Sequence, residues 1–316
     1  MALRSVIQGC GACLPAQVLD NVELAERHGL DTTDTWIRER SGITRRHMAG
    51  PGESATSLGA EAARRALAQA GATADEVDCI IVATATPDNA FPATAVHIQR
   101  ELGMTRGFGF DVSAACTGFI FALSIADSML RSGQARSALV IGTEVYSRIL
   151  DWTDRGTCVL FGDGAGAVFL RAVEGSERGI LSSHLHSDGR QAGILYVEGT
   201  DGPLRMAGRE VFKHAVTKLA AVVDEALAAN GLDRSAVDWL VPHQANIRII
   251  EAMGRKLDLP PERVVVTVDQ HANTSAASVP LALSVAVGDG RIRQGDLVLL
   301  EAIGGGLTWG ATLLRF

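Results

Sequence analysis

The chain has 316 residues, of which 47% are hydrophobic and 21% are charged, and its formal net charge is −7. This is the composition of a globular protein with one large or two ordinary domains, and the acidic balance argues against partners such as nucleic acid or an anionic membrane. Because no run of 18 apolar residues occurs and Gly9 interrupts the N-terminal segment too early for a signal peptide, we expect a soluble, cytoplasmic protein.

The first half of the chain alternates between strand-like and helix-like segments. The apolar run over residues 77–84 is typical of a buried strand in a parallel sheet with helices on both faces, which makes the fold class α/β. Around it we predict strands over 3–10, 108–112 and 138–143, and helices from about Asn21, over 54–70 and over 93–102.

A run of small residues leads to Cys116 within the segment Asp111–Ala126 and places this cysteine at the start of a buried helix. Free N–H groups and the helix dipole stabilise negative charge there, so we expect the thiolate to be favoured and Cys116 to be a catalytic nucleophile. The alternative is a small core residue, since free cysteine is often buried.

The second half of the chain repeats the first at an offset close to 160 residues. Such a long repeat predicts two copies of one α/β unit, residues 1–173 and 174–316, related by a pseudo-twofold axis. The helices that start near Cys116 and Ser278 should then lie face to face at the centre. Five matched pairs carry this prediction: 66–71 with 226–231, 77–78 with 237–238, 113–116 with 275–278, 122–126 with 282–286, and 166–170 with 310–314.

Two polar clusters follow predicted strands of the second half. His243 comes after the strand that ends near Val241, while His271 and Asn273 come after a predicted strand over 264–268. Ligands of open α/β sheets bind beyond such carboxyl ends. A thiolate, an imidazole and a carboxamide suit acyl transfer, with His271 the less certain histidine. Because His243 matches Ala83 in the repeat, we expect one active site per chain.

Other motifs are weaker evidence for a functional site. Cys10 and Cys13 form a C-x-x-C pair between a short predicted strand and a proline turn, but a zinc site needs two more ligands. The glycines at 9–11 and 162–166 lack the spacing of a dinucleotide-binding loop. Those at 304–306 follow a predicted strand, where bare backbone can donate N–H groups to a ligand. We expect no metal and no other cofactor.

Five motifs, spread from end to end, resemble those of the β-ketoacyl-acyl-carrier-protein synthase III family, thiolase-like condensing enzymes that start bacterial fatty-acid synthesis. The resemblance implies a duplicated thiolase-like fold with five α-β-α-β-α layers. Asn273 at the third catalytic position favours this family over elongating synthases with Cys-His-His and thiolases with Cys-His-Cys. The motifs are D-V-S-A-A-C-T-G-F, D-R-G-T-C-V-L-F-G-D-G-A-G-A, V-P-H-Q-A-N, H-A-N-T-S-A-A-S-V-P and G-G-G-L-T-W-G.

The resemblance also implies an acyltransferase reaction in two stages. A short acyl-CoA, acetyl-CoA first among them, acylates Cys116, while the backbone N–H groups of Cys116 and Gly305 stabilise the oxyanion. Malonyl-acyl-carrier protein then loses CO2, and His243 and Asn273 hydrogen-bond the enolate oxygen. The enolate attacks the acyl-cysteine to give β-ketoacyl-acyl-carrier protein.

Further residues match binding positions of that family. Trp36 and Arg155 would stack on the adenine of CoA, Arg40 would bind phosphate, and Ser41 stands where threonine is common. The other implied contacts are pantetheine with Asn246, the carrier protein with Lys213, Arg248, Arg255 and Lys256, and the acyl pocket of the partner subunit in a homodimer with Phe91.

Three alternatives remain on the sequence alone. A hydrolase with the same three residues would release the acyl group as free acid. A condensing enzyme or acyltransferase of secondary metabolism would share the triad. A non-catalytic homologue would be expected to lose Cys116 or its partners His243 and Asn273, and all three are present.

Overall fold

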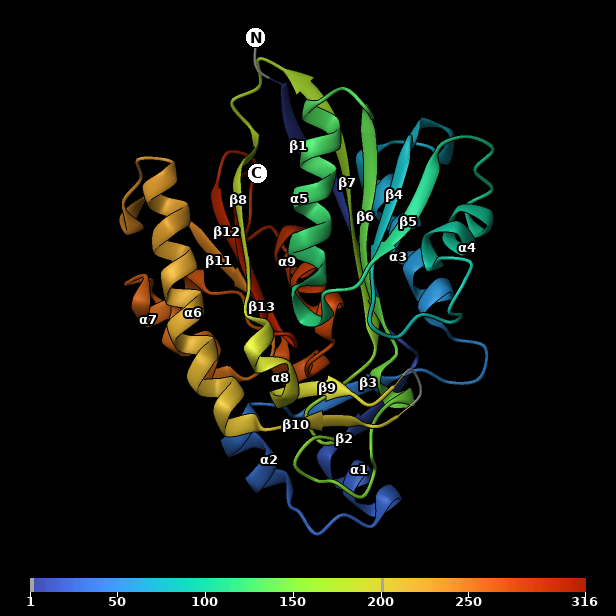
Figure 1. Ribbon diagram of the computed structural model, residues 1–316, viewed down its shortest axis with the longest axis vertical. Coiled ribbons are helices and arrows are strands. Elements are labelled where there is room, and N and C mark those ends of the chain that lie inside the picture. The colour runs from blue at the N-terminus through green and yellow to red at the C-terminus, as the bar shows by residue number, and fades with distance from the viewer. Residues whose placement is uncertain (1–2, 200–201) are drawn as a thin grey trace.

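The computed structural model describes residues 3–199 and 202–316, which form two large sheets, with helices between and outside them, and two short strand pairs (Figure 1). The five-stranded sheet has the order β1 (Leu3–Cys13), β7 (Gly164–Glu174), β6 (Ser137–Glu144), β4 (Cys79–Ala83) and β5 (Phe108–Val112). Only β6, β4 and β5 run parallel, whereas β7 is antiparallel to both β1 and β6. The predicted parallel sheet is therefore wrong for two strands, because β7 returns from β6 without a crossover helix.

The four-stranded sheet has the order β11 (Trp239–Pro242), β12 (Leu297–Gly304), β13 (Thr308–Arg315) and β8 (Gly179–Ser187). This order repeats β4, β6, β7 and β1 of the first sheet, as the internal repeat predicts. The boundary near residue 173 stays a prediction; β7 ends at Glu174 and β8 begins at Gly179.

The predicted strand over 264–268 is wrong. Val264 makes one isolated bridge to Leu240, and the chain then enters the short helix α8 (Val268–His271). The reason is the buried side chain of Gln244, whose oxygen accepts from the N–H groups of Thr267 and Val268 at 2.8 and 3.0 Å. A side chain thus satisfies the backbone groups that a neighbouring strand would otherwise pair.

Helices occupy three layers, and with the two sheets they give the predicted five-layer order (Figure 1). Helices α3 (Ala55–Ala70) and α4 (Thr94–Glu101) cover the first sheet, and α6 (Gly208–Ala229) and α7 (Ile247–Lys256) cover the second. Between the sheets lie α5 (Gly118–Arg131) and α9 (Ser278–Gly288). The remaining elements are α1 (Asn21–His28), α2 (Asp34–Ser41), the pair β2 (Gln17–Asp20) and β3 (Arg45–Met48), and the pair β9 (Leu195–Val197) and β10 (Leu204–Met206).

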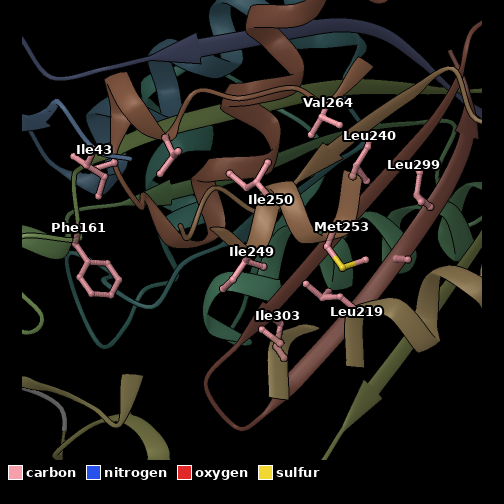
Figure 2. Close-up of a cluster of buried hydrophobic side chains, with 14 of the residues drawn as sticks. Ile43, Phe161, Leu219, Leu240, Ile249, Ile250, Met253, Val264, Leu299 and Ile303 are labelled. Carbon is pink, nitrogen blue, oxygen red and sulfur yellow. The ribbon is translucent and has the colours of Figure 1, made fainter. Parts of the chain in front are cut away.

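Three apolar clusters fill the space between the layers, one outside each sheet and one between the two sheets. The middle cluster joins Leu123 of α5 and Leu283 of α9 to side chains from both sheets. Figure 2 shows part of the cluster under α6 and α7, where Leu219 and Met253 pack near Leu299. Among the described residues, no helix has the length and apolar character that a membrane crossing needs.

Local sequence signals set the ends of several helices. Ser54 caps α3 in a reciprocal pair with Ser57, and Gly71 ends the helix in the left-handed conformation at φ 63°, so the predicted helix over 54–70 is confirmed. Strand β1 extends through Cys13, three residues beyond its predicted end. Cys10 and Cys13 therefore lie within a strand, where both are buried and unbridged.

Helix α9 approaches the first sheet so closely that backbone meets backbone. A Cβ atom added at Gly142 of β6 would lie 2.2 Å from the carbonyl oxygen of Ala276, and one at Gly166 of β7 would lie 2.5 Å from the nitrogen of Leu281. No side chain fits at either position. The two halves are thus in direct backbone contact beside the start of α9.

We expect Gly142→Ala to lower the free energy of unfolding by about 1–3 kcal/mol, because the added methyl group forces a shift in a closely packed interior. Urea unfolding of the intact chain measures this change. Gly288→Ala is the matched control, since nothing lies within 4 Å of its Cβ position. Equal unfolding midpoints for the two variants would contradict the prediction.

Candidate active site

A single cavity of about 1630 Å³ is lined by residues from both halves of the chain. It brings together most of the residues singled out from the sequence, but Phe91, Lys213 and Lys256 lie outside its lining. The predicted residues that do line it are Trp36, Arg40, Ser41, Cys116, Arg155, His243, Asn246, Arg248, Arg255, Asn273 and Gly305.

Cys116 lies on the 3₁₀ turn Ala115–Thr117, which leads directly into α5, and its side chain is 4% exposed. Burial raises the pKa of the thiol to about 12; the Ser275 hydroxyl lowers this pKa and the Glu144 carboxyl raises it. The expectation of a favoured thiolate is therefore wrong, because desolvation outweighs the helix end. The thiol must give up a proton when it reacts.

The turn at Cys116 has a counterpart in the second half, the turn Ser275–Ala277 before α9. Ala115 and Ser275 both open their turns with positive φ, at 45° and 49°, and they are 160 residues apart. Cys116 therefore corresponds to Ala276, not to Ser278. The predicted match of residues 113–116 with 275–278 is therefore wrong by two positions. The sequence does not show which residue of each turn adopts the left-handed conformation.

His243 follows β11 and is held on two sides. Its backbone N–H donates to the backbone carbonyl oxygen of Glu301 at 2.8 Å, and its ring atom Nδ1 lies 2.6 Å from the hydroxyl of Ser278. Burial lowers the pKa of His243 to about 3, so the imidazole is neutral. Since Ser278 Oγ also accepts from the N–H of Gln244 at 3.4 Å, its own proton is free for Nδ1. In the tautomer in which the hydroxyl donates to Nδ1, the ring proton is on Nε2 and Nε2 is a donor.

Asn273 is oriented by its own backbone turn. Its carboxamide oxygen accepts from the N–H of Ser275 at 2.8 Å, which leaves the NH2 group as a donor. Its backbone N–H donates to the carbonyl oxygen of Leu160 at 2.9 Å, and its carbonyl oxygen accepts from the N–H of Gly162 at 3.0 Å. His243 and Asn273 thus bring two neutral donors to the cavity that Cys116 lines.

The glycine turn after β12 is fixed against the turn that carries Cys116. The hydroxyl of Thr117 donates to the carbonyl oxygen of Thr308 at 2.9 Å. A Cβ atom at Gly304 would lie 2.7 Å from the backbone nitrogen of Cys116, so only glycine permits this approach. Gly305 is the next residue and lines the cavity. The oxyanion pair of Cys116 and Gly305 stays a prediction, and this contact supports it.

Trp36 and the exposed Arg40 and Arg155 form the part of the cavity lining that we call the mouth. The two guanidinium carbons lie 4.7 and 5.2 Å from the centroid of the Trp36 ring, and Arg155 also donates to the carbonyl oxygen of Asp31. A flat base inserted between the indole and Arg155 needs about 7 Å, two contact distances, so Arg155 must withdraw by about 2 Å.

Ser41 and Asn246 serve the backbone in this structure. The Ser41 hydroxyl is buried and donates to the carbonyl oxygen of Ile37 at 2.6 Å. Asn246 caps α7 by accepting from the N–H of Arg248 at 2.9 Å, and it donates to the carbonyl oxygen of Arg40 at 2.7 Å. The side chain of Ser41 thus stabilises the end of α2, and that of Asn246 stabilises the start of α7. Their contacts with CoA stay predictions.

The predicted carrier-protein residues differ in how much charge they leave free. Arg248 is exposed and lines the cavity beside Arg255, which pairs with Glu251 at 3.8 Å. Lys213 is exposed on α6. Lys256 binds Asp224 at 2.8 Å, so its charge is largely neutralised. Arg209, which the sequence reasoning did not select, also lines the cavity and is exposed.

Phe91 lies on the segment between β4 and α4 and is 85% exposed. A phenylalanine this exposed favours contact with another protein surface. Its insertion into a partner subunit stays a prediction.

Comparison with known proteins places the chain. The family described as 3-Oxoacyl-[acyl-carrier-protein (ACP)] synthase III matches residues 110–189, and the C-terminal part of that family matches residues 227–316. A β-ketoacyl-[acyl-carrier-protein] synthase III of Acidiphilium cryptum (strain JF-5) is 66% identical over 320 aligned residues, which cover 99% of both chains. The chain belongs to the β-ketoacyl-acyl-carrier-protein synthase III family.

Solved structures of synthase III proteins extend this similarity to the fold. The 3-oxoacyl-[acyl-carrier-protein] synthase III of Aquifex aeolicus VF5 superposes with a TM-score of 0.95 at 46% identity, covering 99% of this chain and 100% of that one. The priming β-ketosynthase of the R1128 polyketide biosynthetic pathway has a TM-score of 0.92 at 37% identity, with 98% and 96% covered. The predicted thiolase-like fold is confirmed, and the chain is a condensing enzyme of fatty-acid biosynthesis.

Four residues near the synthase III cavity escaped the sequence reasoning as site residues. Ser278 positions His243, and the hydroxyl of Ser275 donates to that of Tyr146 at 2.9 Å; both serines stand in the matched run after Asn273. Tyr146 stacks on Phe161 with ring centroids 4.9 Å apart and lines the cavity. The sequence signal that could have identified Glu144 is a carboxylate at the end of an apolar strand. The alternative histidine, His271, does not line the cavity.

Proposed function

We propose that the enzyme condenses a short acyl-CoA, acetyl-CoA first among them, with malonyl-acyl-carrier protein, and that an acyl group on Cys116 is the intermediate. The observation that carries this proposal is the shared cavity, where Cys116 lies with two neutral hydrogen-bond donors, His243 and Asn273, behind an aromatic and cationic mouth.

The first step transfers the acyl group from CoA to Cys116. Trp36, Arg40 and Arg155 suit the nucleotide part of CoA, since an indole and guanidinium groups stack on a flat base and bind phosphate. The sulfur of Cys116 attacks the thioester carbonyl, whose oxygen becomes negative. Backbone N–H groups of Cys116 and Gly305 stabilise that charge without having to ionise.

The second step generates a carbanion from the malonyl group. When CO2 leaves, negative charge moves to the oxygen of the remaining thioester, and Nε2–H of His243 and the NH2 group of Asn273 donate to it. A neutral imidazole serves as this donor because it does not lose a proton to the enolate. The enolate carbon then attacks the acyl carbonyl and releases Cys116 as the leaving group. No step of this proposal uses a metal or another cofactor.

The partners follow from the surface around the mouth. Arg248, Arg255 and Lys213 give an acidic chain a local basic face, which suits an acidic carrier protein better than the overall charge does. Phe91, exposed on the segment before α4, would be covered in a homodimer and would reach the partner's acyl pocket.

A second candidate function is priming of polyketide synthesis. It is favoured by the similarity to the R1128 priming β-ketosynthase at 37% identity, although the relative from Acidiphilium cryptum is closer at 66%. The two functions differ in the carrier protein that delivers the malonyl group.

Intact-mass measurement tests the proposal. The protein is incubated with a panel of acyl-CoAs, and malonyl-carrier protein from fatty-acid or polyketide synthesis is then added in separate reactions. We expect an acyl adduct that disappears as β-ketoacyl-carrier protein forms. Absence of an adduct, or its loss only as free acid, would contradict a condensing enzyme; turnover only with the polyketide carrier would favour the second candidate.

Trp36→Ala is expected to raise KM for acyl-CoA by about 5- to 30-fold with little change in kcat, because it removes about 1–2 kcal/mol of stacking and cation–π contact. Steady-state kinetics at varied acyl-CoA measure this. Arg38→Ala is the matched control, since Arg38 lies on the same helix but pairs with Asp34 and does not line the cavity. A lower kcat at unchanged KM would place Trp36 outside the CoA contact.

A further inference from the structure

Tyr146 belongs to the lining of the cavity, and the reaction described above gives it no role. It opens the 3₁₀ turn Tyr146–Arg148 after β6 and is 4% exposed. A tyrosine buried this completely usually has a hydrogen-bond partner for its hydroxyl. Here the hydroxyl of Ser275, on the turn before α9, donates to the phenol oxygen at 2.9 Å. A side chain of the first half thus holds a turn of the second half.

Ser275 in turn fixes the carboxamide of Asn273. The N–H of Ser275 donates to the carboxamide oxygen of Asn273 at 2.8 Å, which leaves the NH2 group as the donor. The direction of that N–H depends on the backbone of Ser275, which is fully buried and has a φ of 49°. Two hydrogen bonds therefore lead from the phenol of Tyr146 to the amide that donates to the enolate in the proposed reaction.

A second set of contacts connects Tyr146 to the backbone of Asn273. The ring of Tyr146 stacks on that of Phe161, with centroids 4.9 Å apart and an angle of 21° between the ring planes. Phe161 and Asn273 form an isolated β-bridge, in which Asn273 pairs with Leu160 at 2.9 Å and with Gly162 at 3.0 Å. Tyr146 is therefore tied to the backbone of Asn273 through the phenylalanine and to its side chain through the serine.

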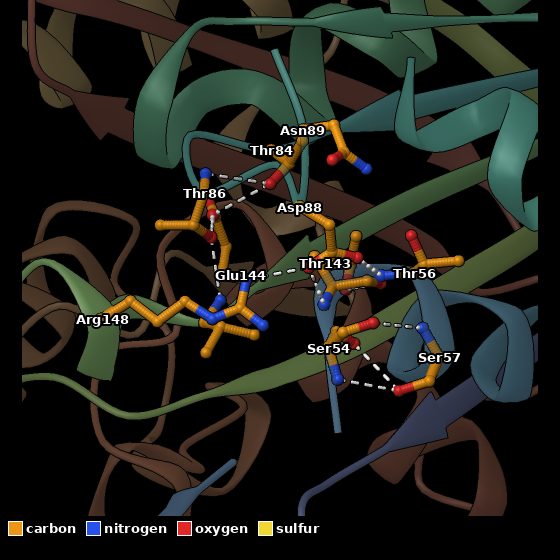
Figure 3. Close-up of polar contacts among 12 residues, drawn as sticks. Ser54, Thr56, Ser57, Thr84, Thr86, Asp88, Asn89, Thr143, Glu144 and Arg148 are labelled. Atoms are coloured by element: carbon orange, nitrogen blue, oxygen red, sulfur yellow. Dashed lines mark hydrogen bonds and ion pairs between the residues drawn. The ribbon is translucent and has the colours of Figure 1, made fainter. Parts of the chain in front are cut away.

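The turn that carries Tyr146 is itself anchored on both sides (Figure 3). The N–H of Val145 donates to the hydroxyl of Thr86 at 2.8 Å, and the guanidinium of Arg148 pairs with the carboxylate of Asp88 at 2.8 Å. A reacting group keeps its geometry when the residues behind it are restrained by packing and hydrogen bonds of their own. The anchored turn meets this condition for Tyr146.

We propose that Tyr146 is a positioning residue for Asn273 and acts through the hydroxyl of Ser275. This proposal rests on the proposed role of Asn273 in decarboxylation. The phenol keeps the turn at Ser275 from rotating, so that the NH2 group of Asn273 already points at the thioester oxygen when CO2 leaves. A donor held in this way stabilises the developing charge without reorganising during the reaction. Acylation of Cys116 uses other donors and does not depend on Tyr146.

Tyr146→Phe tests this contact, because it removes one oxygen atom and keeps the ring that stacks on Phe161. We expect kcat for CO2 release from malonyl-carrier protein, measured without acyl-CoA, to fall about 10-fold. KM for malonyl-carrier protein and the rate of acylation by acetyl-CoA should stay unchanged. Ser275→Ala breaks the same contact from the other side and should give the same loss. Alanine fits at position 275, since Ala115 has a φ of 45° in the matching turn.

Double variants show whether the loss passes through Asn273. Tyr146→Phe combined with Ser275→Ala should release CO2 no more slowly than either single variant, because both remove the same contact. Tyr146→Phe added to Asn273→Ala should cause no further loss, because the amide that the phenol positions is already absent.

Thr143→Val is the matched control. Thr143, labelled in Figure 3, is also fully buried, and its hydroxyl donates to the carbonyl oxygen of Ala55 at 2.8 Å. It lies on β6 but does not line the cavity, so its variant should release CO2 at the wild-type rate. Thermal unfolding of each variant checks that it folds, and Ser275→Ala carries the test if Tyr146→Phe does not fold.

A Tyr146→Phe enzyme that releases CO2 at the wild-type rate would overturn the positioning role, and so would a further loss in the Asn273→Ala background. Equal losses of CO2 release and acylation would also overturn it, since they indicate general damage to the cavity. CO2 release needs no acyl group on Cys116, so the two proposals fail separately. The expected losses without any acetyl adduct on the wild type would sink only the proposed function. Normal condensation with no effect of Tyr146→Phe would sink only the positioning role.

Discussion

Cys116→Ala is expected to abolish the acyl adduct and to lower the rate of condensation by at least about 10³-fold, because Cys116 is the one thiol among the described residues that line the cavity. Intact mass after incubation with acetyl-CoA measures the adduct, and the yield of β-ketoacyl-carrier protein measures turnover. Release of CO2 from malonyl-carrier protein should continue, since both donors, His243 and Asn273, remain.

Cys13→Ala is the control for this variant. Cys13 is also a buried free cysteine, but it lies in β1 and does not line the cavity. It should keep the adduct and the rate of the wild type. An adduct that persists in Cys116→Ala, or one that disappears in Cys13→Ala, would show that the nucleophile has been assigned to the wrong residue.

His243→Ala is expected to leave acylation within a few-fold of the wild type and to lower decarboxylation by about 10²–10³-fold, the loss seen when one donor to a developing oxyanion is removed. The adduct is measured by intact mass, and CO2 release from malonyl-carrier protein is measured separately. Because burial lowers the pKa of His243 to about 3, the imidazole stays neutral down to that pH. No loss of decarboxylation from its titration is therefore expected between pH 5 and 9.

His271→Ala distinguishes the two histidines that the sequence offered. His271 is also buried, with its pKa lowered to about 4 by burial, yet it does not line the cavity. Its variant should decarboxylate the malonyl group at the wild-type rate. If His243→Ala instead prevents acylation, His243 is the base for the thiol and its role as a donor to the enolate is wrong.

Sequence reasoning reached the parts of the fold that depend on local signals. The serine cap and the glycine stop of α3 lie at its ends, and the spacing of the internal repeat predicted two sheets with two helices between them. Cys116, His243 and Asn273 were found because each stands in a recognisable motif, and the first two also follow strands, β5 and β11. These features need only neighbouring residues or a repeat.

The errors and omissions concern residues that meet across long stretches of chain. His243 and Ser278 are 35 residues apart, and Glu144 and Ala276 are 132 apart, so no local pattern pairs them. The strand expected over 264–268 does not form, because the side chain of Gln244 accepts the backbone N–H groups there. The thiolate expected at Cys116 is not favoured, because burial raises the pKa of the thiol. Burial depends on the whole fold, and an apolar helix start alone does not show how completely the thiol is shielded from water.

The backbone contacts of Gly142 with the turn before α9 and of Gly166 with α9 limit how the enzyme can move. The nucleophile belongs to one half and both donors to the other, so their separation is set where these backbones meet. Pulling the halves apart would expose the apolar cluster that α5 and α9 share with both sheets. Adaptation of the cavity to larger ligands therefore has to come from the side chains that line it rather than from a wider gap between the halves.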